Sequence, residues 1–124
     1  MIHNTTQVQE LASEAIGGEV YLGYPQRKIP KDTPFAVLSL NSSVPTVKDR
    51  MNEPIVARVT YSLRIYSNSQ RGLMSLVGSV SDLLGRLGID TIGMSPAYSD
   101  PTYGPYRILI LEVILDRRGN TFQG

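Results

Sequence analysis

The chain has 124 residues, a net charge of +1 and no cysteine. Its length suits one domain that buries about two-thirds of its unfolded surface, and the lack of thiols excludes disulfides and cysteine metal sites. The near-neutral charge argues against binding nucleic acid mainly by electrostatics, and no apolar run reaches the ~20 residues of a membrane span. Because the N-terminus is polar and unlike a secretory signal, we expect a cytoplasmic protein or part of a particle assembled there.

The first predicted element is a helix at residues 4–16, which Asn4 or the threonines after it can cap and Gly17 can end. Its buried stripe comprises Val8, Leu11, Ala12, Ala15 and Ile16. Residues 19–24 then predict a short strand. A basic loop at residues 26–31 follows between prolines, and it is either solvated or a contact patch.

Three segments in the middle of the chain predict a sheet. Residues 35–40 are apolar on both faces, as in a covered strand, and residues 41–54 form a polar connection that we interpret as an arm between two antiparallel strands. Residues 55–67 alternate between apolar and polar side chains, which predicts a strand of roughly 40 Å. Its inner face takes Ile55, Ala57, Val59, Tyr61, Leu63 and Ile65. Its mostly polar outer face takes Val56, Arg58, Thr60, Ser62, Arg64 and Tyr66.

A second helix is predicted at residues 68–88, where Asn68 or Ser69 can cap the start and Gly88 can end it. Its apolar stripe comprises Leu73, Leu76, Val77, Val80, Leu83, Leu84 and Leu87. Gly78 and Gly85 share a face of this helix. They either permit close approach of another element or are tolerated at the surface.

The segment after this helix is harder to assign. Residues 89–94 are either a short edge strand or a turn, and residues 95–105 are dense in turn-forming residues. Tyr98 and Tyr103 lie in this second stretch, and Tyr106 follows directly after it. Tyrosines in such a loop can pack onto the core as a lid or serve as interface anchors, and we keep both interpretations.

Residues 106–116 predict the last strand. Glu112 lies on it and can pair across strands with Arg58 or Arg64. Residues 117–124 read as a loose polar tail. The order helix, strand, strand, long strand, helix, strand predicts a single α+β domain in which two helices pack on one face of a mostly antiparallel sheet.

We find no signature of catalysis or of a bound cofactor. The nucleophile-elbow, phosphate-loop and zinc-protease motifs are absent, and the only histidine is His3, near the N-terminus. The carboxylates are scattered over predicted helix surfaces and loops. We therefore expect a protein that is not an enzyme and that uses neither metal nor cofactor.

A series of local features carries a resemblance. It comprises the opening helix, the stretch from Gly23-Tyr-Pro to Thr33-Pro-Phe-Ala-Val-Leu, the strand at residues 59–66 running into a helix, and Tyr-Gly-Pro-Tyr-Arg at residues 103–107 before an apolar strand. In this order they resemble the tail-completion proteins of long-tailed bacteriophages and prophages, also described as tail terminators or tail-to-head joining proteins. One departure is Tyr66, where that family commonly has a tryptophan.

The resemblance implies a virion structural protein without catalysis. Such a subunit forms a six-fold ring that caps the tail tube, stops its polymerisation and binds head connector proteins. The ring would lie in the tail or neck of the virion, assembled in the cytoplasm of the host bacterium, with neither a membrane nor a specific nucleic acid as partner. For a ring, our interface candidates are Arg58, Arg64, Arg71, Arg86, Tyr98 and Tyr103.

An alternative is a nucleic-acid-binding α+β module. Arg58, Arg64 and the tyrosines on and near the sheet motivate it, because aromatic side chains on a sheet can stack on bases. The near-neutral charge of the chain opposes it.

Overall fold

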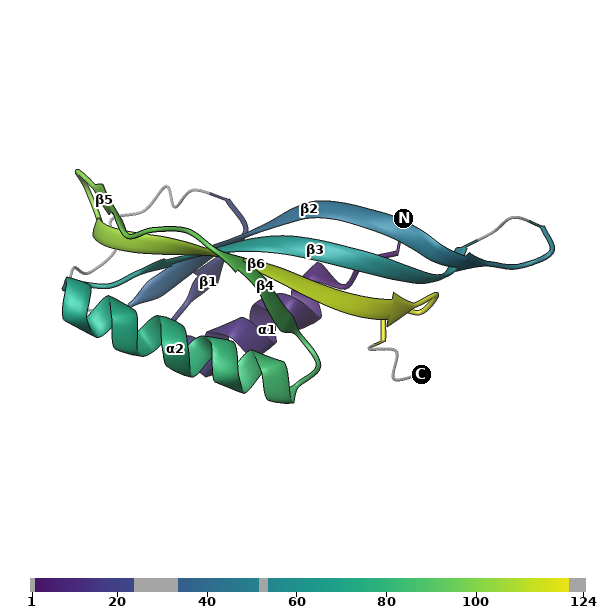
Figure 1. The fold of residues 1–124 in the computed structure, drawn as a ribbon, viewed down its shortest axis with the longest axis horizontal. Coiled ribbons are helices and arrows are strands. Elements are labelled where there is room, and N and C mark those ends of the chain that lie inside the picture. The colour runs from purple at the N-terminus through teal and green to yellow at the C-terminus, as the bar shows by residue number, and fades with distance from the viewer. Residues whose placement is uncertain (1, 24–33, 52–53, 121–124) are drawn as a thin grey trace.

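The computed structural model describes residues 2–23, 34–51 and 54–120. Within these ranges the chain forms one sheet with both helices on the same side of it (Figure 1), which confirms the predicted α+β class. In chain order the elements are α1 (Thr5–Ile16), β1 (Val20–Tyr21), β2 (Phe35–Lys48), β3 (Pro54–Tyr66), α2 (Gln70–Arg86), β4 (Asp90–Met94), β5 (Tyr98–Asp100) and β6 (Gly104–Asp116). The predicted basic loop at residues 26–31 lies outside the described residues.

Side-chain caps set where the two helices begin. The Asn4 side chain accepts a hydrogen bond from the Gln7 backbone N–H at 3.2 Å and donates one to Gln7 Oε1 at 2.8 Å. Ser69 Oγ accepts one from the Gly72 N–H at 3.0 Å, so Ser69 is the cap of α2. Gly17 ends α1 with a φ of 67°, a left-handed conformation that glycine adopts at little cost.

The sheet has the strand order β1-β2-β3-β6-β4, and β5 pairs separately with β6. The short β1 runs parallel to β2, whereas all other pairs are antiparallel. The hairpin of β2 and β3 extends past both helices at one end of the molecule (Figure 1). We call residues 41–51, with the paired residues 54–60, the arm.

The prediction of a polar connection at residues 41–54 is wrong for residues 41–48. These residues continue β2, with irregularities in register between Leu40 and Ser42 and again on either side of Val47. Their polar side chains bond across the strands instead: Asn41 pairs with Ser62 at 2.7 Å and Ser42 with Thr60 at 2.6 Å. Because these strand residues are polar, their sequence resembles that of a loop.

Two further segments are ordered where the sequence left them open or loose. Residues 90–94 are the edge strand β4, one of the two alternatives for that stretch. Residues 117–120 form a turn in which Gly119 is buried and its carbonyl accepts a hydrogen bond from Asn4 Nδ2 at 2.9 Å. The expected loose tail is therefore wrong for this turn, and residues 121–124 lie outside the described residues.

The core lies between the helices and the inner face of the sheet. On β3, every second residue from Ala57 to Ile65 is fully buried, as the alternation predicts. From α2, the core takes Leu73, Val77, Val80 and Leu84. Leu83 and Leu87 remain 41% and 42% exposed, so the predicted stripe is too wide on that flank of the helix.

Candidate functional site

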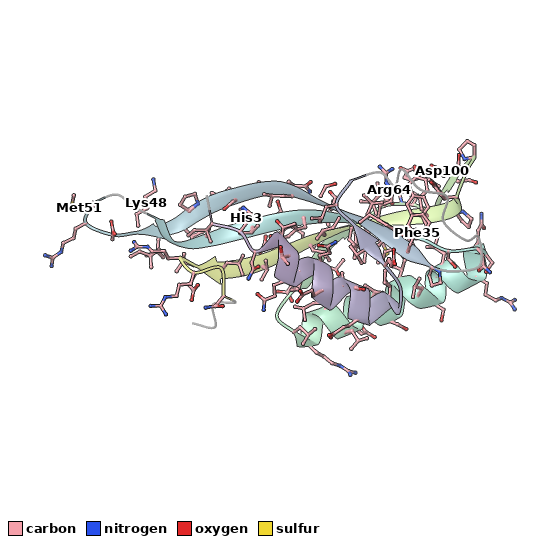
Figure 2. The ribbon with its side chains drawn as sticks, turned by 180° about the vertical axis from the view of Figure 1, so that it is seen from behind. His3, Phe35, Lys48, Met51, Arg64 and Asp100 are labelled. Carbon is pink, nitrogen blue, oxygen red and sulfur yellow. The ribbon has the colours of Figure 1, made fainter. Side chains whose placement is uncertain are left out.

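The face of the sheet opposite the helices, which we call the open face, carries the side chains of interest. On β3 it presents the even-numbered residues from Val56 to Tyr66, because the odd-numbered ones point into the core. Figure 2 shows its two ends, with Phe35 and Arg64 near one and Lys48 and Met51 near the other. The predicted polar character holds only in the middle, since Val56 and Tyr66 are both buried.

One end of the open face holds a second, aromatic core. Phe35 stacks on Tyr66 with ring centroids 4.5 Å apart, and Tyr103 meets both rings edge-on at 5.1 and 5.8 Å. The other members of this aromatic cluster are Tyr21, Val37 and Tyr106. Its rings come from four separate segments of the chain, so the cluster ties β1, β2, β3 and the start of β6 together.

Arg64 lies over this cluster. Its guanidinium carbon is 5.0 Å from the centre of the Tyr106 ring, within cation–π range, and Nη1 donates to the Tyr66 hydroxyl at 3.4 Å. Burial raises the pKa of the Tyr66 hydroxyl above its usual value, although the hydrogen bond and charge of Arg64 act in the opposite direction. The Arg64 side chain is therefore held in place against the sheet.

Hydroxyl and amide groups occupy the middle of the open face. The Asn41–Ser62 and Ser42–Thr60 pairs bridge β2 and β3 here. Between this belt and the aromatic cluster lies a groove of about 400 Å³, lined by Gly23, Val37, Ser39, Asn41, Ser62, Arg64 and Ile108. This groove is suited to polar contacts, because most of its lining side chains are small and polar or charged.

The arm end of the open face mixes apolar and basic side chains. Val44 and Val47 are 54% and 49% exposed, and Met51 at the tip is 81% exposed. Arg58 pairs with Glu112 at 3.7 Å, which is the first of the two alternatives predicted for this carboxylate. Arg117 binds Asp49 at 2.8 Å and so links the arm to the turn after β6.

The structure separates the six interface candidates into two groups. Arg64, Tyr98 and Tyr103 belong to or border the aromatic cluster, and Tyr98 contacts the Tyr106 ring at 5.6 Å while staying 47% exposed. Tyr103 therefore packs as a lid, whereas Tyr98 keeps the exposure that an anchor needs. Arg58 lies on the same open face, in the arm.

Arg71 and Arg86 lie elsewhere, in the first and last turns of α2, on the helix side of the sheet. Both are exposed. Arg86 suits the end of a helix because its charge complements the helix dipole there. These two arginines do not join the others in one surface.

Phe35 and Tyr66 belong to the aromatic cluster, and the sequence did not propose either of them as a site residue. A usable signal was present, since residues 35–40 are apolar on both faces and Tyr66 interrupts the polar side of β3. A strand that is apolar on both faces requires cover on its second side, and the aromatic cluster supplies it.

The described residues give little support for other kinds of site. They contain no group of three histidine or carboxylate side chains placed to hold a metal ion. Of the helices in this part of the chain, neither has the length and apolarity needed to cross a membrane. The sequence matches no protein-family model and no curated protein.

Proposed function

We propose that this protein is a structural subunit of a phage or prophage tail: a tail terminator or tail-to-head joining protein that forms a ring, with a hexamer as the expected size. The ring caps the tail tube and binds the head connector. The observation that supports this best is the arm, a long hairpin that leaves the helix layer and exposes apolar side chains at its end. A monomer gains nothing from that exposure, whereas a partner surface would bury it.

The open face supports the same proposal. It has a rigid aromatic end, a polar middle and a mixed apolar and basic arm, so one subunit can make several protein contacts along its length. Arginine and tyrosine are also the residue types that contribute most at protein interfaces. A subunit that works by shape in this way requires neither nucleophile nor cofactor.

The direct test mixes the purified protein with tail tubes of the virus or prophage that encodes it. We expect the protein to sediment with the tubes and to stop their growth, even if the free protein is monomeric. A control uses tubes that already carry their terminator, to which added protein should not bind. A protein that ignores open tube ends and head connectors alike would contradict the proposal.

A charge reversal tests the part played by the open face. Arg64→Glu should leave the fold intact, since the side chain is only half-buried, and should lower the yield of infectious particles by about tenfold or more. Arg71→Glu is the comparison variant for the open face. It makes the same charge change at an interface candidate on the helix side, in the first turn of α2, where a carboxylate suits the helix dipole. Circular dichroism checks folding. A normal particle yield from folded Arg64→Glu protein would contradict the assignment.

The open face also gives the nucleic-acid-binding alternative one favourable observation, namely the exposure of Tyr98 close to the cluster on which Arg64 lies. The other rings argue against it, because Phe35 and Tyr66 are only 4% and 1% exposed and cannot stack on bases. Titration with labelled single-stranded DNA and RNA decides the matter. We expect no binding at low salt, where any electrostatic binding is strongest.

A further inference from the structure

Both lateral edges of the sheet carry strands that lack a partner on one side among the described residues. On one side, β1 covers β2 only at Ala36 and Val37, so the stretch Leu40–Lys48 has β3 as its single strand partner among the described residues. The Ser43 hydroxyl within it also donates a hydrogen bond to the Ile2 carbonyl. On the other side, β4 pairs only with β6. Each edge leaves backbone N–H and C=O groups pointing outward, and such an edge is a template for pairing with another strand.

Both edges carry exposed apolar side chains. Ile92 on β4 is 55% exposed, and Val44 and Val47 on β2 are 54% and 49% exposed. The charges of the two edges are complementary, because β4 begins with Asp90 and β2 ends with Lys48. An antiparallel pairing of the two strands brings the start of one towards the end of the other, and therefore Asp90 towards Lys48.

We propose that β4 of one copy adds to the Leu40–Lys48 edge of β2 in the next copy, so that subunits join through a continuous sheet. This inference rests on the proposed ring and names the contact that closes it. The partner is a second copy of this chain because the chain itself carries both halves of the contact. Because β4 and the free stretch of β2 lie at opposite lateral edges of the sheet, they cannot pair with each other within one subunit.

Strand directions agree with this contact. β2 and β6 run one way, and β3 and β4 run the other, because each neighbouring pair from β2 to β4 is antiparallel. In a ring whose axis runs along the strands, each copy keeps these directions, so β4 meets the next β2 antiparallel. Such head-to-tail contacts close into a ring when the rotation per subunit divides the circle.

Pro45 limits the length of the pairing. It lacks an N–H, and prolines of this kind are tolerated at sheet edges, where they prevent indiscriminate strand addition. The register irregularities around Val47 have a similar effect. The edge therefore accepts only a short strand, and β4 is short, with five residues.

Disulfide cross-linking tests the contact cleanly, because the natural chain has no cysteine. Ile92→Cys is combined in turn with Val44→Cys, Thr46→Cys or Lys48→Cys, and the assembled protein is oxidised with tail tubes present. We expect at least one double variant to give a ladder of covalent multimers that ends at the closed ring and collapses on reduction. Ile92→Cys with Glu14→Cys, on the exposed side of α1, is the matched control and should give no ladder.

The single variants separate the possible geometries. Ile92→Cys alone should give no covalent dimer, because β4 meets β2 rather than another β4. A dimer from this variant would overturn the proposal in favour of a two-fold contact. A ring of the expected mass in which none of the double variants cross-links would also overturn it while leaving the proposed function standing. Protein that binds no tubes would instead contradict the proposed function, and the contact with it.

Discussion

The two faces of the sheet differ in how they are stabilised. The inner face is a continuous apolar layer under two helices, where Leu63 and its neighbours are fully buried. The open face instead has a local aromatic core at one end, hydrogen-bonded polar pairs in the middle and exposed valines at the other. The inner face contributes most of the buried apolar side chains, so the exposed part of the open face is available for other roles.

The aromatic cluster refines this comparison. It buries Phe35 and Tyr66 without a helix above them, because rings from neighbouring segments cover one another. That end of the open face is therefore rigid and closed, whereas the arm end is apolar and exposed. A surface that is closed at one end and exposes apolar side chains at the other is suited to docking a protein partner.

The largest expected effect comes from the inner face. Leu63→Ala removes a fully buried side chain and should lower the free energy of unfolding by about 2–5 kcal/mol. Its matched control is the neighbouring Ser62→Ala on the open face. This variant loses two exposed hydrogen bonds with the Asn41 amide and should cost about 1 kcal/mol or less. Urea denaturation measures both variants. Equal losses would mean that the two faces do not differ as described.

An intermediate effect concerns alkaline pH. Because burial raises the pKa of Tyr66 in the folded protein, the folded state holds this proton more tightly than the unfolded state does. The contribution of Tyr66 to stability is thus complete below about pH 10, the ordinary tyrosine pKa, and is lost as the pH rises through the folded-state value. Tyr66→Phe should flatten this decline in urea midpoints measured across that range. If the stability of Tyr66→Phe falls with pH as steeply as that of the natural chain, the fall arises from other titrating groups.

The smallest effect is expected at the ion pair on the open face. Arg58 and Glu112 are 3.7 Å apart, and the Arg58 side chain is 57% exposed, so solvent screens their attraction. Glu112→Gln should change the free energy of unfolding by less than about 1 kcal/mol, and added salt should diminish that change. A double-mutant cycle with Arg58→Gln measures the coupling. A coupling of several kcal/mol would show that charges on the open face hold the fold.

Much of the fold follows from local patterns in the sequence. The alternation along residues 55–67 predicts β3 and its buried face, and capping residues and glycines predict both helices. The strand at residues 41–48 could not be predicted, because its polar side chains resemble those of a loop and only the pairing with β3 shows that it is a strand. The exposure of Leu83 and Leu87 could not be predicted either, because helical periodicity does not say how wide a stripe of the helix the sheet will cover.

The site is less predictable for a related reason. Arg64, Tyr98 and Tyr103 could be proposed as surface residues, yet their meeting place depends on which strands are neighbours. Phe35 and Tyr66 are 31 positions apart in the chain and stack because β2 and β3 pair in one particular register. Long-range pairing of this kind leaves no local trace, and so neither the cluster nor the separation of Arg71 and Arg86 from it is visible in the sequence.

Electron microscopy of negatively stained tail tubes, with and without the purified protein, tests the central claim most directly. We predict that a ring appears at the growing end of each tube and that tube lengths stop increasing once it is bound. Bare tube ends beside unassembled protein, at concentrations well above those of the tubes, would contradict the account.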